Sequence, residues 1–139
     1  MSASRFVDTN ILVYAHDLDA GDKRERAAAV VSDLWDSREG MISVQVLQEF
    51  YVTITRKVPQ PLAMPEARAI VEAYRAWRVQ APTASTVLRA SEIQQRNQLS
   101  FWDAMILATA EEGGAEVILS EDLNQGQLIE GIRVENPLA

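Results

Sequence analysis

The stretch Phe6-Val7-Asp8-Thr9-Asn10-Ile11-Leu12-Val13 sets three polar residues between two apolar runs. The apolar pair before Asp8 is typical of the end of a short buried strand, whereas Asp, Thr and Asn are residues that often begin a helix. The stretch therefore predicts a strand that ends at Val7 and a helix that begins at Asp8–Asn10 and runs to about His16. It also places a carboxylate at the junction between the two.

Outward from this junction, short apolar segments alternate with amphipathic segments along the chain. The expected strands cover 41–42, 78–81, 116–119 and 132–134, and the expected helices cover 22–39, 44–57, 64–77, 83–97 and a segment from Ser100 onward. Gly40 is expected to stop a helix, and 120–131 is expected to form turns. This alternation predicts an α/β fold in one domain of residues 1–139, a three-layer α/β/α sandwich with a short, mainly parallel central sheet.

The composition limits the classes of partner and compartment. With 13 Lys and Arg against 20 Asp and Glu, the formal net charge is −7, which argues against a protein that holds nucleic acid through a broadly basic surface. The chain has no cysteine, so disulfides, thiolate zinc sites and cysteine nucleophiles are excluded. No apolar stretch approaches the ~18 residues of a membrane span, and we expect a cytoplasmic protein with no membrane partner.

Four carboxylates stand among apolar residues, namely Asp8, Glu49, Asp103 and Asp122. Each has an ordinary structural explanation. Asp8 is a favoured helix cap, and Glu49 could lie on a solvated helix face. Asp103 could share a capping box with Ser100, and Asp122 could form an Asx turn. However, ligands of parallel α/β folds bind beyond the carboxyl ends of the strands, where Asp8 and Asp122 are both expected.

The joint placement of these acids predicts a cation site. Carboxylates that are forced together repel one another and raise one another's pKa values unless a cation lies between them. A group of oxygen ligands in a chain with one histidine and no cysteine suits Mg²⁺ or Mn²⁺. Glu121 is an alternative to the adjacent Asp122 as the fourth acid of the cation site. The sequence pattern leaves this choice open.

Four short segments of the chain contain the four acids. They are Val7-Asp8-Thr9-Asn10-Ile11-Leu12, Gln48-Glu49-Phe50, Leu99-Ser100-Phe101-Trp102-Asp103-Ala104-Met105-Ile106 and Leu119-Ser120-Glu121-Asp122-Leu123. In this order and at these separations they resemble the motifs of PIN domains, most closely those of the VapC-type toxin ribonucleases of VapBC toxin–antitoxin modules. The resemblance extends through the closing 131–137. At one position, Asn124, many relatives carry a further acid.

The resemblance implies a metal-dependent endoribonuclease, the toxin of a type II toxin–antitoxin module. The catalytic and metal-binding residues would be Asp8, Glu49, Asp103 and Asp122, holding one or two Mg²⁺ or Mn²⁺ ions. The residues that orient these ligands or the substrate would be Thr9, Asn10 and Ser120. Metal-activated water would hydrolyse the RNA phosphodiester and leave a 5′-phosphate and a 3′-hydroxyl. The implied partners are the RNA substrate, a cognate antitoxin protein and a second copy of the chain in a homodimer.

Two other functions stay open from the sequence. The first is a catalytically degenerate PIN-like domain that acts as a protein-interaction module. The intact set of acids argues against this alternative. The second is an acid-pocket phosphatase of another α/β family. Haloacid-dehalogenase-like phosphatases carry Asp-x-Asp after the first strand, whereas this chain has Asn10 in the third position. A dinucleotide-binding module would need a glycine-rich turn there, and the sequence has none.

The remaining polar and aromatic residues are expected to have structural roles. His16 is expected to be a helix cap or a surface group, outside the site. The large aromatic residues expected in the core are Trp35, Trp77 and Trp102. The cations expected on solvated helix faces, rather than in contact with RNA, are Arg24, Arg26, Arg56 and Lys57.

Overall fold

The computed structural model describes residues 4–139, so residues 1–3 of the expected domain lie outside it. The strands are β1 (Arg5–Val7), β2 (Gly40–Ser43), β3 (Arg78–Gln80), β4 (Val117–Leu119), β5 (Leu128–Ile129) and β6 (Ile132–Glu135). The helices are α1 (Thr9–His16), α2 (Asp22–Ser37), α3 (Val44–Arg56), α4 (Met64–Tyr74), α5 (Ala84–Asn97) and α6 (Phe101–Glu112). Within this range, none of the helices has the length and apolar character needed to cross a membrane.

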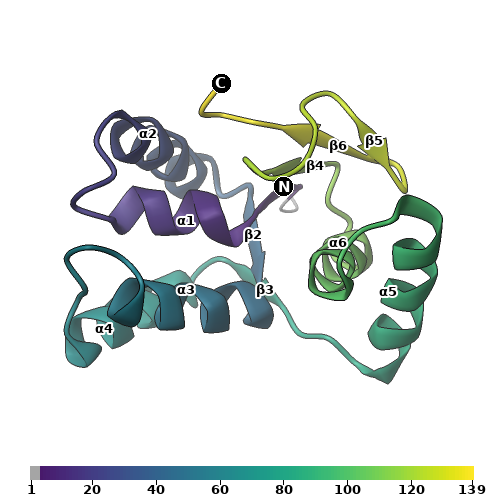
Figure 1. Cartoon of the computed structure of the whole chain (residues 1–139), viewed down its shortest axis with the longest axis horizontal. Helices are drawn as coiled ribbons and strands as arrows, with labels where there is room; N and C mark the ends of the chain where they lie inside the picture. The colour runs from purple at the N-terminus through teal and green to yellow at the C-terminus, as the bar shows by residue number, and fades with distance from the viewer. Residues whose placement is uncertain (1–3) are drawn as a thin grey trace.

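A six-stranded sheet in the order β3-β2-β1-β4-β6-β5 forms the middle layer of the described chain. Neighbouring strands run parallel except for β5, which pairs antiparallel with β6. Figure 1 shows α1 to α4 on one side of the sheet and α5 and α6 on the other. Every residue of β2 and β4 is buried, because helices cover both faces. The expected three-layer fold with a mainly parallel sheet is confirmed.

The structure corrects the ends of two helices. Helix α2 stops at Ser37, and Arg38 follows in the left-handed conformation with a φ of 62°. Gly40 is therefore not the helix stop but the first residue of β2. A Cβ atom at position 40 would lie 2.7 Å from the ring of Trp77, so the missing side chain allows the strand and the ring to pack together. Helix α4 ends at Tyr74, before its expected end at Trp77.

The segment 120–131, expected to consist of turns, also contains a strand. Leu128 and Ile129 pair with β6 as β5, and the connecting Glu130 and Gly131 have φ values of 52° and 83°. Positive φ at both central residues is the geometry of a tight hairpin turn that suits the twist of antiparallel strands. A two-residue strand is too short to show an alternating pattern, which is why the sequence did not reveal it.

Helix α6 packs between the sheet and α5. Residues 104–110 are all buried, so the middle of this helix is covered all round rather than on one face. Trp102, in its first turn, is 63 % exposed, and the expectation that it belongs to the core was wrong. Trp77 is buried as expected, whereas Trp35 is 38 % exposed at the edge of an aromatic group that includes Tyr74.

His16 is neither a free surface group nor a simple cap. Its Nε2 atom lies 2.8 Å from the Tyr74 hydroxyl, and its ring packs edge-on against Phe50 and Tyr74. Burial, followed by the positive charge of Arg24, lowers the pKa of His16. The side chain therefore ties the end of α1 to α3 and α4.

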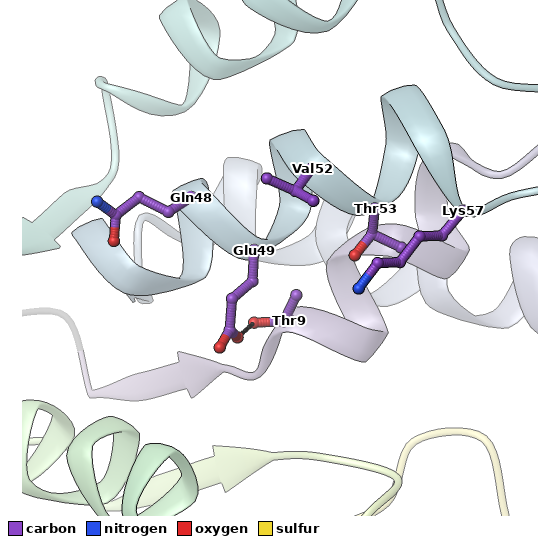
Figure 2. Close-up of a pocket in the computed structure, with 6 residues that line it drawn as sticks. All are labelled: Thr9, Gln48, Glu49, Val52, Thr53 and Lys57. Atoms are coloured by element: carbon purple, nitrogen blue, oxygen red, sulfur yellow. Dashed lines mark hydrogen bonds between the residues drawn. The ribbon is translucent and has the colours of Figure 1, made fainter.

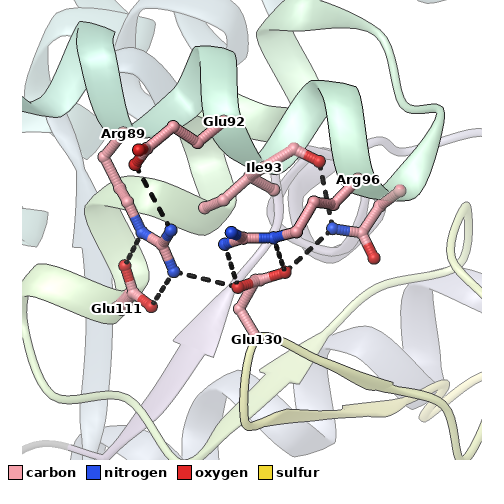
Figure 3. Close-up of polar contacts among 7 residues, drawn as sticks. Arg89, Glu92, Ile93, Arg96, Glu111 and Glu130 are labelled. Carbon is pink, nitrogen blue, oxygen red and sulfur yellow. Dashed lines mark hydrogen bonds and ion pairs between the residues drawn. The ribbon is translucent and has the colours of Figure 1, made fainter.

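A polar network joins α5, α6 and the β5–β6 hairpin (Figure 3). The Glu130 carboxylate accepts hydrogen bonds from Arg89, Arg96 and Asn97 on α5. Arg89 also binds both carboxylate oxygens of Glu111 on α6. The Glu130 side chain is 16 % exposed, and its hydrogen bonds, that from Arg96 foremost, lower its pKa to about 2. The hairpin is thus held by charge rather than by apolar packing alone.

Substitution Glu130→Gln should lower the free energy of unfolding at pH 7 by about 1–2 kcal/mol, because it removes the charge that two guanidinium groups share. The folded protein keeps this carboxylate ionised to lower pH than the unfolded chain does. Its stabilisation is therefore present above pH 4.5 and fades as the pH falls toward 2. Urea unfolding followed by circular dichroism at pH 7 and pH 2.5 measures both effects.

The matched control is Glu92→Gln, which removes an exposed partner of Arg89 alone. This control should change the free energy of unfolding far less. A Glu130→Gln protein as stable as the Glu92→Gln protein at pH 7 would contradict the stabilising role of the network.

Candidate active site

The register of β1 and β4 brings Asp8 and Ser120 together at the carboxyl edge of the sheet. Val7 pairs with Leu119, and the Asp8 amide donates to the Leu119 carbonyl at 2.9 Å. Ser120 Oγ donates to Asp8 Oδ2 at 2.8 Å, and the Thr9 amide donates to Asp8 Oδ1 at 2.8 Å. Asp8 therefore caps α1, as its residue type favours, and holds a carboxylate at a buried junction.

Asp8 lies in an acidic environment. Only 7 % of the residue is exposed. Burial raises the pKa of Asp8 to about 6; the hydrogen bonds from Ser120 and Thr9 oppose this rise, and the negative charges of Asp103 and Asp122 add to it. Two of the other predicted acids are therefore near enough for their charges to act on Asp8.

Glu121 and Asp122 have different surroundings, although they are adjacent. Glu121 accepts a hydrogen bond from the Tyr14 hydroxyl at 2.7 Å and pairs with Lys23 Nζ at 2.7 Å. The bond from Lys23, followed by that from Tyr14, lowers the pKa of Glu121. Asp122 instead follows Ser120, whose Oγ accepts from the Asp122 amide at 3.1 Å. The negative charge of Asp122 is also among the causes that raise the pKa of Asp8.

Glu49 reaches the same junction from α3. Thr9 Oγ1 donates to Glu49 Oε1 at 2.7 Å, and Figure 2 shows the two side chains in contact. Gln45 Nε2 donates to Glu49 Oε2 at 3.1 Å and to the carbonyl of Trp102, the residue before Asp103, at 3.1 Å. Glu49 is thus tied to the start of α1 and, through Gln45, to the start of α6.

Asp103 lies in the first turn of α6. Ser100 Oγ accepts a hydrogen bond from the Asp103 amide at 3.1 Å and so caps the helix. Only this half of the expected capping box forms within residues 4–139, because the Asp103 carboxylate accepts no bond from the Ser100 amide. The carboxylate is left without a capping role at the positive end of the helix dipole.

Hydrogen bonds link the segments that carry the four acids. The residues in this series are Trp102, Gln45, Glu49, Thr9, Asp8, Ser120 and Asp122. As placed, no three acidic or histidine side chains of the described chain form a group able to hold a metal ion. The acid-bearing segments therefore meet at one junction without a closed coordination group.

Asn10 has a positioning contact at the same edge. Its Oδ1 atom accepts a hydrogen bond from the Glu121 amide at 3.4 Å, which holds the turn after β4. Its Nδ2 atom is buried and has no hydrogen-bond partner within residues 4–139. Asn10 thus binds backbone and does not add a carboxylate to the junction.

Two adjoining hollows open beside the acids. The first has a volume of about 400 Å³ and is lined by Thr9, Gln48, Glu49, Val52, Thr53 and Lys57 (Figure 2). The second, of about 390 Å³, shares Thr9, Thr53 and Lys57 and adds Asp122 among others. The two hollows adjoin at these shared residues of α1 and α3, and we call the two together the acid groove.

Sequence reasoning missed Gln45 as the residue that fixes Glu49. The available signal was the spacing of four residues, which puts the two on one helix face. Lys57 is exposed, as expected of a solvated position, and it also lines both hollows beside the acids. Thr53 lies between Glu49 and Lys57 and carries no sequence signal of its own.

Comparison with known proteins places these features in a family. The family model of the PIN domain matches residues 5–129. A search of curated proteins gave no match.

Several solved structures resemble the chain. VapC20 of Mycobacterium tuberculosis, described as a sarcin-ricin loop cleaving toxin, is 26 % identical with a TM-score of 0.64 over 86 % of this chain and 90 % of that chain. A toxin–antitoxin complex from Klebsiella pneumoniae is 23 % identical, with a TM-score of 0.71 over 96 % and 98 %. DNA-bound VapBC from Salmonella typhimurium is 22 % identical, with a TM-score of 0.66 over 97 % and 98 %. The last two show a shared fold alone. The family model covers most of the length of this chain, so the chain belongs to the PIN domain family.

Proposed function

We propose that this chain is a ribonuclease toxin of a type II toxin–antitoxin module that hydrolyses RNA phosphodiester bonds where β1, β4, α3 and α6 meet. The observation that carries the proposal is the series of hydrogen bonds that links Asp8, Glu49 and the start of α6. Ordinary caps and turns would satisfy each acid within its own segment. The likeness to VapC20, a sarcin-ricin loop cleaving toxin, supports RNA as the substrate.

The donor set fits a hard divalent cation, Mg²⁺ or Mn²⁺. The proposed catalytic and metal-binding residues are Asp8, Glu49, Asp103 and Asp122. Their oxygen atoms are ligands that these ions prefer, and a cation would relieve the repulsion that Asp103 and Asp122 exert on Asp8. A bound ion would supply a Lewis acid that makes water more acidic and stabilises charge on the phosphate.

Neighbouring polar residues hold these ligands in position. Thr9 binds Asp8 through its amide and Glu49 through its hydroxyl, so it fixes the separation between the two. Ser120 orients the other oxygen of Asp8, and Asn10 holds the turn that leads to Asp122. Two acids on different segments thus share one positioning residue, which supports the roles proposed for Thr9, Asn10 and Ser120.

The two alternative functions have less support. A domain kept only for protein binding would have no need for the bonds that orient Asp8 and Glu49. An acid-pocket phosphatase would need a second acid after the first strand, and Asn10 binds the Glu121 backbone there instead.

We also propose a cognate antitoxin as the protein partner. The similar structures from Klebsiella pneumoniae and Salmonella typhimurium are toxin–antitoxin assemblies. Next to the acid groove, α3 and α4 border an apolar hollow of about 610 Å³ whose lining includes Leu47, Tyr51 and Val71. Such a surface suits an apolar helix of a partner. A homodimer and a cytoplasmic location belong to the same proposal.

RNA cleavage by the purified protein should require Mg²⁺ or Mn²⁺ and should fall about a hundredfold or more in Asp103→Asn. Asparagine keeps the shape of the side chain, and Ser100 still caps the helix, but the charge that a metal ion needs is lost. Asp8→Asn and Glu49→Gln should be similarly impaired. Gel analysis of labelled RNA with added metal and with EDTA measures these effects.

The matched control is Glu121→Gln, compared with Asp122→Asn. Glu121 is paired with Tyr14 and Lys23, so its substitution should retain most of the activity, whereas Asp122→Asn should lose activity. Cleavage that needs no metal, or a folded Asp103→Asn protein as active as the wild type, would overturn the proposed function.

Without divalent metal at pH 7.5, Asp8→Asn should be more stable than the wild type by up to about 3 kcal/mol. The ordinary pKa of this carboxyl is 3.8, and its pKa in the folded protein is about 6. The folded state therefore holds the proton more strongly, and the wild type loses stability as the pH rises between these values. The difference should fall below about 1 kcal/mol near pH 4. Urea unfolding in EDTA at pH 7.5 and pH 4 measures it.

Added Mg²⁺ or Mn²⁺ should raise the melting temperature of the wild type and have much less effect on Asp8→Asn, because the ion binds only the folded acids. Equal shifts in both proteins would show that the ions act elsewhere. An Asp8→Asn protein less stable than the wild type in EDTA at pH 7.5 would contradict the electrostatic account.

A further inference from the structure

A polar row on α3 leads away from the acids. Glu49 and Thr53 of α3 and Lys57, which caps the end of this helix, are spaced by four residues, which places them on one face. All three line the hollow shown in Figure 2. Eight residues of α-helix span about 12 Å, so Lys57 is attached about two helical turns beyond Glu49. A group bound at Lys57 is therefore distinct from a group that reacts at the acids.

The polar ends of Thr53 and Lys57 are free of competing contacts. Of the two lysines, Lys23 is paired with Glu121, whereas Lys57 takes part in none of the ion pairs within residues 4–139. The Thr53 hydroxyl also has no hydrogen-bond partner in that range, unlike the hydroxyl of Thr55, which donates to its own helix. Both groups are thus available to a ligand in the groove.

Lys57 is the only cation of the described chain that lines either hollow beside the acids. The neighbouring Arg56 lines neither of them, and Arg68 lines the apolar hollow instead. The net charge of the chain is −7, so much of its surface repels a polyanion. A single ammonium group in the groove therefore has a large influence on where a polyanion binds.

We propose that Lys57 and Thr53 form a subsite for a phosphate of the RNA strand next to the phosphate that is cleaved. A lysine ammonium and a threonine hydroxyl are common phosphate contacts. The second hollow places Val13, Val58 and Pro59 beside them, and these side chains offer an apolar wall to the attached ribose or base. The subsite deepens the proposed function and rests on it for the identity of RNA as the ligand.

Binding can be measured apart from cleavage by fluorescence anisotropy, with a labelled single-stranded RNA, Mg²⁺ buffer and the Asp103→Asn protein. In this background Lys57→Gln should weaken binding about tenfold. The slope of log Kd against log salt should fall by about 0.7, the value for one lost phosphate contact on a single strand. Lys57→Arg should restore most of the affinity, and Thr53→Val should weaken binding about threefold.

The matched control is Arg56→Gln, which removes the same charge one residue earlier. It should leave both the affinity and the salt slope unchanged within about twofold, because Arg56 lines neither hollow. In the otherwise wild-type protein, Lys57→Gln should raise KM for RNA cleavage about tenfold with little change in kcat. Circular dichroism checks that each variant is folded.

Equal losses of affinity in Lys57→Gln and Arg56→Gln would show only a general attraction between charges and would overturn the subsite. Unchanged RNA binding in Lys57→Gln would overturn it as well. Selective weakening of RNA binding in Lys57→Gln, in a protein whose wild type does not cleave RNA, would uphold the subsite and refute the proposed function.

Discussion

The burial of one carboxylate at the end of β1 is the constraint on which the rest of the junction depends. A charged group removed from water is costly unless hydrogen bonds and opposite charge compensate it. Ser120 and Thr9 supply the hydrogen bonds to Asp8, but the nearby acids add negative charge rather than positive. These contacts exist because β1 and β4 pair in one register, since a shift by one residue would turn the side chains to the opposite faces.

Most of the fold could be predicted because its signals are local. Helix starts at Ser43 and Ser100 follow from cap residues that bind the next turn, and buried strands follow from short apolar runs. The errors arose where contacts between distant segments decide the outcome. Gly40 looks like a helix stop until Trp77, from a later segment, is packed against it. The strand β5 exists through its pairing with β6, and the turn between them is bound to α5 through Glu130. Neither contact can be predicted from the two residues of β5.

The sequence predicted the acids of the candidate site but not the contacts that hold them in position. It could not separate Glu121 from Asp122, because that choice depends on Lys23 and Tyr14, which bind Glu121 from other segments. It likewise gave no sign that Gln45 links two helices, since its contact with the Trp102 carbonyl crosses the fold. The catalytic and metal-binding roles of the four acids stay predictions.

The bond between Asp8 and Ser120 also bears on when this part of the fold can form. Its two partners are 112 residues apart in the chain. Strand β1 lies between β2 and β4 in the sheet, so its pairing on the second side requires β4. Contacts between such distant segments form late, because a long loop must close first. A nascent chain on the ribosome therefore lacks this junction until residues beyond β4 have emerged, so the hydrogen-bonded series from Trp102 to Asp122 is completed only after most of the chain has been synthesised.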